Sequence, residues 1–415
     1  MNKTVVELFA GVGGFRVGLN NITVIDKNGK AIENGEWDFL WANQWEPATK
    51  QQYAFECYKA RFNGSEVSNI DISLVDKNEI PHHTLLVGGF PCQDYSVARS
   101  LSKEKGIEGK KGVLWWQINE IIRTKRPPFI LLENVDRLIK SPSKQRGRDF
   151  GVMLRCLADQ NYSCEWRVIN AADYGGPQRR RRVYIFAYDN KTNYGKIFSK
   201  QNPDKVINSC GLFAKTFPVE NDRVKANKIQ LIDGFIDLLE ISNKFEASFS
   251  SSGYMRKGIV YTKKNSPIFI KPIPLSKIVE SAKVDEHYFL TPLQIEKFKY
   301  LRGGKVIPRI NSEGHKYSYS EGAMSPYDAL SLPGRTMLTS EGTTNRSTHI
   351  IMDKKEKRLR KLTPIECERL NQFPDNWTNT DMPENKRYFI MGNALVCGII
   401  QKIGSQISKI VEEED

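Results

Sequence analysis

Two residues able to do covalent chemistry stand at the ends of apolar runs in this sequence. Cys92 follows the stretch LLVGGFP, and Glu133 directly follows Phe129–Leu132. A thiol next to a rigid proline at a strand end points into a crevice, where its thiolate can act as a nucleophile. A carboxyl at the end of a neighbouring strand is partly desolvated, which raises its pKa and keeps a proton available. Together they suit addition of sulfur to an electron-poor ring, although each alone also fits a structural role, as a core cysteine or a helix cap.

Four consecutive arginines, residues 179–182, lead into the apolar run Val183–Ala187. Side chains alternate between the two faces of a strand, so Arg180 and Arg182 share one face and the other two arginines share the opposite face. One pair can stabilise a thiolate or hold a phosphate while the other faces solvent. A run of four arginines is otherwise typical of a solvated surface.

The apolar runs that carry these residues predict an α/β fold. Such runs occur at Val5–Phe9, Leu85–Val87, Phe129–Leu132 and Val183–Ala187, and helical patterns such as the one around Leu114–Ile122 lie between them. Strands separated by helices form a doubly wound, mostly parallel sheet, which binds ligands beyond the carboxyl ends of its strands. The chemically distinctive residues all lie at those ends, so the sequence predicts a site there.

A glycine-rich turn, Phe9–Gly14, follows the first predicted strand and lets a nucleotide-like ligand approach the backbone closely. Arg16 occupies the place of the third glycine of a dinucleotide motif, which favours a ligand without pyrophosphate, of which S-adenosylmethionine is the common one. Trp45 can hold an adenine ring and Glu46 can accept hydrogen bonds from ribose hydroxyls. A core tryptophan beside a solvated acid fits the same two residues. Asp71-Ile72 can close the adenine site from the third strand.

The composition favours a soluble protein with a polyanionic partner. The chain has 415 residues and a formal net charge of +14, from 62 Lys and Arg against 48 Asp and Glu, which favours nucleic acid before a membrane. No apolar run approaches the ~18 residues of a membrane span, and the N-terminus has no signal-peptide pattern, so we expect a cytoplasmic protein. The seven cysteines include no C-x-x-C pair and the histidines are scattered, so neither a disulfide framework nor a metal site is expected.

The texture of the sequence changes near residue 191. Polar, turn-rich stretches mix with short apolar pieces as far as about residue 345, and one of them, Ser340–His349, is rich in hydrogen-bonding side chains. That stretch fits a surface loop and a recognition loop equally well. Capping boxes at Thr291–Gln294 and Thr363–Glu366 predict the starts of two helices.

Six motifs occur in one order along the chain: Phe9-Ala-x-x-Gly-Gly, Pro91-Cys92-Gln93, Glu133-Asn134-Val135, Gln178 to Arg182, the block Arg360–Pro374, and Gly392-Asn393-Ala394. Together they resemble the DNA (cytosine-5)-methyltransferase family of the bacterial restriction-modification type. The resemblance implies that residues 1–190 form the catalytic and cofactor-binding domain, of the S-adenosylmethionine-dependent methyltransferase fold. Residues 191–345 would then be a second, smaller mixed target-recognition domain, and residues 346–415 would return to the catalytic domain.

The resemblance also implies a role for each motif. Cys92 would attack C6 of a cytosine flipped out of duplex DNA, while Glu133 holds N3, and Arg180 and Arg182 orient the base and assist the cysteine. S-adenosylmethionine would give its methyl group to C5 and leave as S-adenosylhomocysteine. The cofactor site would comprise Phe9, Gly11, Gly13, Gly14, Trp45, Glu46, Asp71, Ile72, Pro91, Leu114 and Asn393. Contacts with double-stranded DNA would come from Gln93, Ser96 and Arg99 near the cysteine and from Ser340, Thr343, Asn345 and Arg346.

One position departs from the pattern of the family. The family commonly has an acid where Gln44 stands, to bind the ribose of the cofactor. The nearest acid is Glu46, so either Glu46 takes over this contact or Gln44 makes it as a neutral amide.

Two other functions remain as alternatives. A tRNA cytosine-5 methyltransferase would have a much shorter segment between Arg182 and Arg360, so the long segment favours duplex DNA. A catalytically silent DNA-binding regulator would be expected to lose Cys92 or Glu133, and the sequence has both. An adenine amino-methyltransferase is excluded, because the Pro-Pro-Phe at 127–129 follows an arginine and precedes a strand. The expected protein is a monomer, with a possible restriction endonuclease that acts separately.

Overall fold

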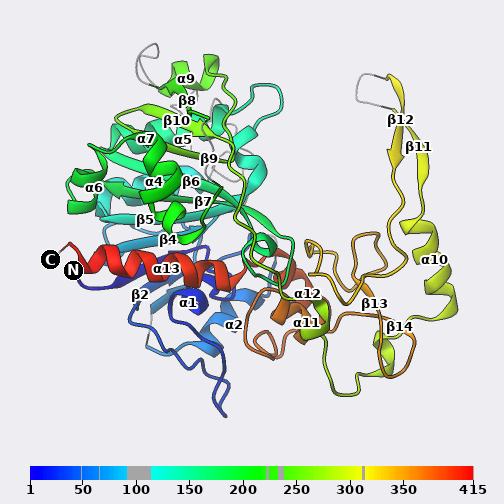
Figure 1. Cartoon of the computed structure of the whole chain (residues 1–415). Helices are drawn as coiled ribbons and strands as arrows, with labels where there is room; N and C mark the ends of the chain where they lie inside the picture. Colours follow the sequence, from blue (N-terminus) through cyan, green and yellow to red (C-terminus); the bar gives the residue numbers. More distant parts are fainter. Residues whose placement is uncertain are drawn as a thin grey trace.

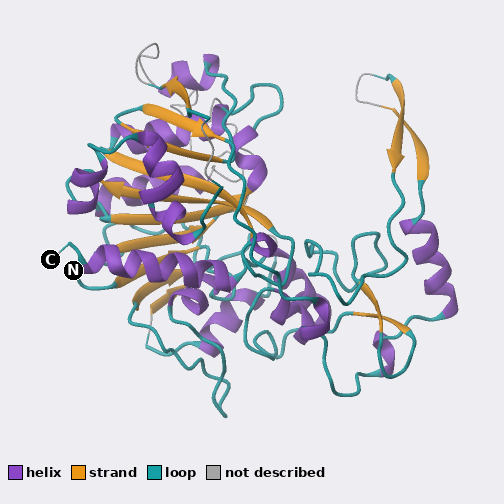
Figure 2. Cartoon of the chain, in the orientation of Figure 1, coloured by secondary structure: helices purple, strands orange, loops and turns teal. Residues whose placement is uncertain are grey.

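A large mixed sheet covered by helices on both faces forms the body of the protein (Figure 1, Figure 2). The computed structural model describes residues 1–47, 49–64, 66–90, 114–220, 224–231, 238–310 and 314–414. The sheet has ten strands in the order β3-β2-β1-β4-β5-β7-β6-β9-β10-β8. The α/β fold class predicted from the sequence is therefore confirmed.

The half of the sheet that holds the predicted site is parallel. Its strands are β1 (Thr4–Leu8), β2 (Asp38–Asn43), β3 (Glu66–Ser68), β4 (Leu85–Gly89) and β5 (Phe129–Val135). The helical elements along this part of the chain are α1 (Gly14–Leu19), α2 (Tyr53–Arg61), α4 (Leu114–Lys125), η1 (Asp136–Lys140) and α5 (Arg148–Asp159). Since the strands are parallel, their carboxyl ends meet at one edge, where the glycine turn and Glu133 both lie.

Strand β7 (Arg181–Asp189) runs antiparallel to both of its neighbours, β5 and β6 (Tyr162–Asn170). The alternation of strand and helix patterns predicts a parallel strand here, and that prediction is wrong. The reason is the short connection, because only residues 171–180, which include the turn η2 (Ala171–Asp173), lie between β6 and β7. A parallel return needs a crossover of about a dozen residues or more, usually a helix. Arg182 therefore enters the site from the start of its strand.

Three further strands of the sheet come from the segment assigned to a second domain. They are β8 (Asn227–Gln230), β9 (Ser252–Arg256) and β10 (Ile259–Lys263), and they extend the sheet beyond β6 by antiparallel pairing. The helical elements of this part are α6 (Asn193–Phe198), α7 (Pro203–Lys205), η3 (Val206–Cys210), α8 (Leu212–Thr216) and α9 (Leu238–Lys244). The expected boundary at residue 190 does not coincide with the end of the sheet, which continues to Lys263.

The chain then leaves the sheet and builds a smaller lobe (Figure 1). Its elements are η4 (Leu275–Lys277), η5 (Glu286–Tyr288), α10 (Pro292–Arg302), β11 (Lys305–Ile310), β12 (Lys316–Glu321), β13 (Ile350–Met352), β14 (Leu359–Lys361) and α11 (Pro364–Leu370). Both predicted capping boxes are confirmed: Thr291 and Gln294 begin α10, and Thr363 and Glu366 begin α11. In each box the side chain of one residue accepts from the backbone of the other, which satisfies two N–H groups that the first turn leaves open.

The last two helices, α12 (Glu384–Asn393) and α13 (Cys397–Glu412), return to the sheet. Helix α13 packs against α1 and α8, and Lys3 pairs with Glu412 at 2.6 Å, so the chain ends lie together (Figure 1). None of the described helices alone has the length and hydropathy to cross a membrane. Only α12 and α13 taken together meet those two criteria, as a pair bent by 43°.

Candidate active site

Glu133 ends up beside an arginine at the carboxyl edge of the sheet. Its Oε1 atom lies 2.9 Å from Nε of Arg182 on the neighbouring strand, and the two side chains are only 12% and 15% exposed. Burial raises the pKa of Glu133, while the charges of Arg182 and Arg180 oppose this rise. Burial thus shifts the pKa of this carboxyl in the direction that the predicted chemistry requires, while an arginine fixes its orientation.

The end of β4 lies next to this carboxyl. Gly89 is opposite Glu133 in the register of the sheet, and a Cβ atom on Gly89 would lie 3.3 Å from Oε2 of Glu133. Asn134 donates a hydrogen bond of 2.8 Å to the carbonyl of Phe90 and so fixes where the chain leaves the strand. This role of Asn134 was not predicted. The next residues, 91–113, contain Pro91, Cys92, Gln93, Ser96 and Arg99 and lie outside the described residues.

The four arginines alternate as predicted. Arg179 and Arg181 are exposed, whereas Arg180 is buried and Arg182 half-buried. Arg180 donates hydrogen bonds of 2.9 Å to the carbonyls of Met337 and of Gly392. Burial and the charge of Arg182 lower the pKa of Arg180 to about 9. Its contacts hold two distant segments of the chain against β7, so the expected contact of Arg180 with the base stays a prediction.

Gln178, the first residue of the arginine motif, also connects distant segments of the chain through hydrogen bonds. It is fully buried, donates to Oδ1 of Asn371 at 2.9 Å, and accepts from the backbone N–H of Met337 at 2.8 Å. The segment around Met337 also approaches α12 so closely that a Cβ atom on Gly392 would lie 2.4 Å from the backbone of Leu338. This contact explains why a glycine precedes Asn393, the exposed last residue of α12.

The turn after β1 has the backbone conformation that its glycines predict. Phe9, Gly11 and Gly13 have φ values of 54°, 57° and 84°. A Cβ atom on Gly13 would lie 2.4 Å from the ring of Phe62, whereas one on Gly11 would meet nothing within 4 Å. Gly11 thus borders open space in which a ligand can approach the backbone.

Gln44 has a structural partner within this turn. Its Oε1 atom accepts the N–H of Gly11 at 2.7 Å, which ties the turn to the end of β2. Glu46 is half-buried, and burial raises the pKa of its carboxyl while the charge of Lys386 opposes the rise. The amide oxygen of Gln44 thus serves the turn, and which of Gln44 and Glu46 contacts a ribose stays a prediction.

The other predicted cofactor residues border the same edge. Trp45 and Asp71 are half-buried just beyond the ends of β2 and β3, Ile72 is buried, and Leu114 begins α4. A Cβ atom on Gly14 would lie 3.0 Å from the side chain of Leu395, two residues beyond Asn393, so the end of α12 lies near the turn. An aromatic ring, two carboxylates and an open glycine turn fit a nucleoside ligand such as S-adenosylmethionine.

A buried carboxyl, that of Glu7, lies on the strand before the glycine turn and contacts the start of α1 after it. Glu7 on β1 is fully buried and accepts a hydrogen bond of 3.1 Å from the hydroxyl of Tyr58. Burial raises the pKa of Glu7 to about 8, although the bond from Tyr58, the charge of Arg16 and backbone N–H groups at the start of α1 oppose the rise. No pattern in the sequence pointed to this role, because Glu7 is a single acid within the strand-like apolar run Val5–Phe9.

We expect Glu7→Gln to make stability less sensitive to alkaline pH. The carboxyl has an ordinary pKa of 4.5 and a native pKa of about 8, so the folded state binds more protons between these values. The stability that Glu7 contributes is complete below pH 4.5 and is lost as the pH rises through about 8, whereas glutamine cannot ionise. Thermal unfolding at pH 6 and pH 9 tests this, with the exposed Glu36→Gln as the control. Equal losses of Tm in Glu7→Gln and wild type would contradict it.

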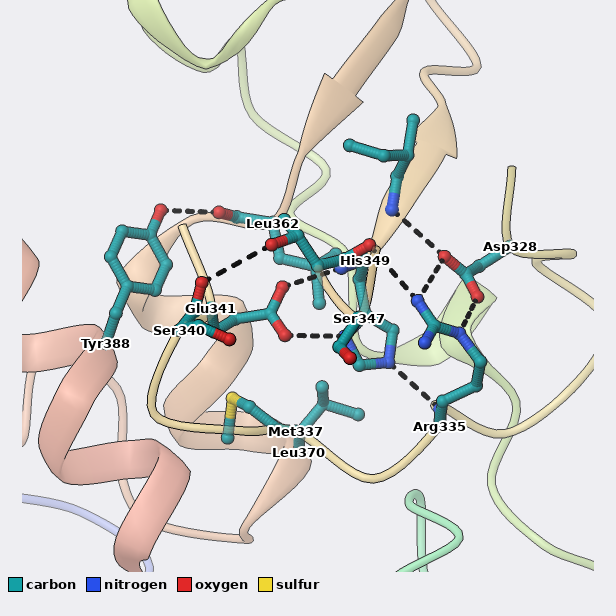
Figure 3. A network of polar contacts seen from close by, with 12 residues as sticks. Asp328, Arg335, Met337, Ser340, Glu341, Ser347, His349, Leu362, Leu370 and Tyr388 are labelled. Carbon is teal, nitrogen blue, oxygen red and sulfur yellow. Dashed lines mark hydrogen bonds and ion pairs between the residues drawn. The ribbon is translucent and has the colours of Figure 1, made fainter. Parts of the chain in front are cut away.

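The loop Ser340–His349 is anchored from within by a buried polar network (Figure 3). His349 and Glu341 are almost fully buried, with Nδ1 of the histidine 3.0 Å from Oε2 of the glutamate. The backbone N–H of Arg335 donates to Nε2 of His349 at 2.9 Å, so Nε2 is an acceptor and Nδ1 carries the proton that binds Glu341. The loop is therefore held in one conformation by its own acid and histidine.

The predicted DNA-binding residues of this loop differ in their surroundings. Thr343 and Asn345 are exposed, and Ser340 is half-buried with its carbonyl accepting the hydroxyl of Thr343 at 2.7 Å. Arg346 donates to the carbonyl of Leu301 at 2.6 Å, so it ties the loop to the end of α10. Contact of these four residues with DNA stays a prediction. Among the residues that the structure describes, no cluster of three or more His, Cys, Asp or Glu could hold a metal ion.

The fold and the site together define an α/β enzyme with a nucleoside-type cofactor turn and a buried acid at adjacent strand ends. A family model described as C-5 cytosine-specific DNA methylase matches residues 3–409, and the chain belongs to this family. This confirms the resemblance seen in the sequence.

Individual relatives agree with this assignment. The chain is 53% identical over 413 residues to the type II methyltransferase M.Sau3AI of Staphylococcus aureus, covering 99% of this chain and 97% of that protein. It is 34% identical over 188 residues to the type II methyltransferase M.HhaI of Haemophilus parahaemolyticus, covering 45% of this chain and 50% of that protein. Among solved structures, a mutant of Spodoptera frugiperda DNMT2 matches with a TM-score of 0.58 at 14% identity, covering 98% of this chain and 99% of that one. Entamoeba histolytica EhMeth matches with a TM-score of 0.57 at 16% identity, covering 100% and 99%, and both show a shared fold.

Proposed function

We propose that this chain is the modification enzyme of a type II restriction-modification system. It methylates C5 of a cytosine within one short sequence of double-stranded DNA and so protects that DNA from an endonuclease that acts separately. The similarity to M.Sau3AI over nearly the full length of both proteins supports this role. We further propose that the enzyme works as a monomer in the cytoplasm.

The observation that carries the mechanism is the pairing of Glu133 with Arg182 beside the end of β4. Cys92 follows that strand end by three residues in the sequence. Its thiolate forms a bond to C6 of the flipped cytosine, while the Glu133 carboxyl holds N3 and draws electrons toward it. C5 of the base becomes nucleophilic as a result. Arg182 keeps the carboxyl oriented and is the arginine best placed to contact the base.

The remaining steps restore the enzyme. S-adenosylmethionine supplies an electrophilic methyl group when it is bound at the turn. The methyl carbon would pass to C5 as its bond to the sulfonium sulfur breaks, which leaves S-adenosylhomocysteine. C5 then releases its proton to water, the electrons of that C–H bond re-form the C5–C6 double bond, and the bond from the sulfur of Cys92 to C6 breaks. Cys92 leaves as the thiolate with which it began. No redox partner is needed, because every bond that forms is matched by one that breaks.

Different residues of the proposed cofactor site contact different parts of the nucleoside. Trp45 stacks on the adenine, Asp71 accepts from it, and Glu46 accepts from the ribose hydroxyls. Gln44 does not contact the ribose in this proposal, because its amide oxygen holds the N–H of Gly11. The open space at Gly11 supports a close approach of the ligand to the turn.

Bisulfite sequencing tests the proposed function. An unmethylated plasmid and a tRNA pool are incubated separately with the protein and S-adenosylmethionine, with the cofactor omitted as the control. We expect cytosines to resist conversion at one recurring short context in the plasmid and at none in tRNA. Resistance confined to tRNA would replace DNA as the substrate, and resistance in neither sample would indicate a silent binder.

A further inference from the structure

Strands β11 and β12 form a two-stranded ribbon that stands away from the rest of the protein (Figure 1, Figure 2). Large side chains are exposed on it: Val306 and Ile310 are 64% and 65% exposed, and Tyr317 and Tyr319 are 47% and 39% exposed. An isolated two-stranded ribbon is marginally stable in water, because it has no core of its own. The exposed ribbon therefore needs an explanation outside its own packing.

The root of the ribbon is held rigidly. Arg302, at the end of α10, is almost completely buried and donates to Oδ2 of Asp328 at 2.9 Å and to the carbonyl of Thr348 at 2.6 Å. Asp328 also accepts a hydrogen bond from the guanidinium of Arg335. The backbone N–H of Arg335 in turn donates to Nε2 of His349 (Figure 3). Arg346 donates to Glu321 at the last position of β12. These bonds fix the direction in which the ribbon projects.

One face of the ribbon carries an arginine, Arg309, whose guanidinium is oriented by stacking on a tyrosine ring. Arg309 lies opposite Tyr317, and its guanidinium sits over the ring of Tyr319 at 4.0 Å from the centroid. Its N–H groups donate no hydrogen bond to another residue in the described part of the chain. A planar guanidinium held flat by stacking, with its donors available, is suited to bidentate recognition of two acceptors in one plane.

Two features favour DNA over a protein strand as the partner. Pro308 lies in the middle of β11 and has no N–H group, which opposes the addition of another strand along that edge. The described ribbon residues include Lys305, Arg309 and Lys316, against the single acid Glu321, which pairs with Lys305 at 3.2 Å. The surplus of positive charge suits a polyanion.

We propose that the ribbon enters the major groove of the substrate duplex and that Arg309 reads a guanine there through O6 and N7. A strand of six residues is about 20 Å long, and the major groove, about 12 Å wide, admits a two-stranded ribbon. This inference rests on the proposed function, and it adds an element that the sequence pattern did not point to. The loop Ser340–His349 then serves partly as the support of the ribbon.

Fluorescence anisotropy with a set of short duplexes tests the role of Arg309. One duplex carries the sequence found by bisulfite mapping. Each of the others has one G·C pair of that sequence replaced. Arg309→Ala is expected to weaken binding of the mapped duplex about ten- to a hundred-fold and to abolish the preference at one G·C position. Arg309→Lys should not restore it, because lysine lacks the planar pair of donors. Arg358→Ala is the matched control, since Arg358 also stacks on a ring, that of Phe289, but pairs with Glu286.

The outcomes separate this inference from the proposed function. If the wild-type protein neither binds nor methylates duplex DNA, the proposed function fails. If the wild type does both and Arg309→Ala keeps the same affinity and base preference, the assignment of Arg309 is overturned. An equal loss of affinity for every duplex would also overturn base reading and leave only a phosphate contact. Unchanged binding of S-adenosylmethionine, measured by calorimetry, verifies that the variant is folded.

Discussion

A Cys92→Ser enzyme is expected to lose methyl transfer by about 10⁴-fold or more, while it still binds duplex DNA and S-adenosylmethionine. A serine hydroxyl is a far weaker acid than a thiol, so it supplies almost no anion to attack C6. Loss of the nucleophile has an effect of this size in other enzymes that work through covalent intermediates. Transfer of a radiolabelled methyl group to the mapped duplex measures the effect.

A trapped adduct tests the same residue directly. A duplex with 5-fluorocytosine at the target position has no proton on C5 to lose, so the wild-type enzyme should remain bonded to it through sulfur after denaturation. Cys92→Ser should form no such complex, whereas Cys210→Ser, a change at a half-buried cysteine far along the chain, should behave as the wild type. Undiminished turnover in Cys92→Ser would remove the covalent mechanism.

Glu133→Gln is expected to lower kcat by about 10²- to 10⁴-fold, the usual contribution of a general acid. Glutamine keeps the shape of the side chain but cannot hold the proton at N3 of the base in the same way. Burial raises the pKa of Glu133, so the protonated form is lost only as the pH rises through that raised value. The fall of wild-type kcat on the alkaline side should therefore disappear in the variant. Methyl transfer at several pH values, with saturating cofactor, measures both effects.

The controls for Glu133 come from its own surroundings. Arg182→Lys keeps a positive charge but loses the Nε atom that lies 2.9 Å from Glu133, so we expect an intermediate loss of kcat. Asp136→Asn changes the partner of the exposed Arg181 and should leave kcat unchanged. A Glu133→Gln enzyme with more than about a tenth of wild-type kcat would contradict the role of an acid.

Local patterns in the sequence were enough to predict much of the site. The strand before Glu133, the glycine turn at Phe9–Gly14 and the two capping boxes depend on residues close together in the chain. The alternation of Arg179 to Arg182 follows from the geometry of a single strand. Hydrophobic period and turn chemistry are local properties, so such features can be read before the fold is known.

Contacts between distant parts of the chain were decided only by the tertiary structure. Arg180 donates hydrogen bonds to carbonyls 157 and 212 positions further along the chain, so it links distant segments beside the site. The run of four arginines in the sequence did not indicate these partners. The ribbon gave no clear signal either, because Pro308 and its exposed faces match neither a buried strand nor a helix.

The sequence by itself predicted which residues carry the chemistry, namely Cys92, Glu133 and the glycines of the turn after β1, and it determined the α/β fold class that brings strand ends together. Tertiary structure decided the direction of β7 and the partners of Gln44 and Arg180. The physical reason is that backbone conformation depends mainly on neighbouring residues, whereas the partner of a buried polar group depends on which distant segments the completed core brings into contact.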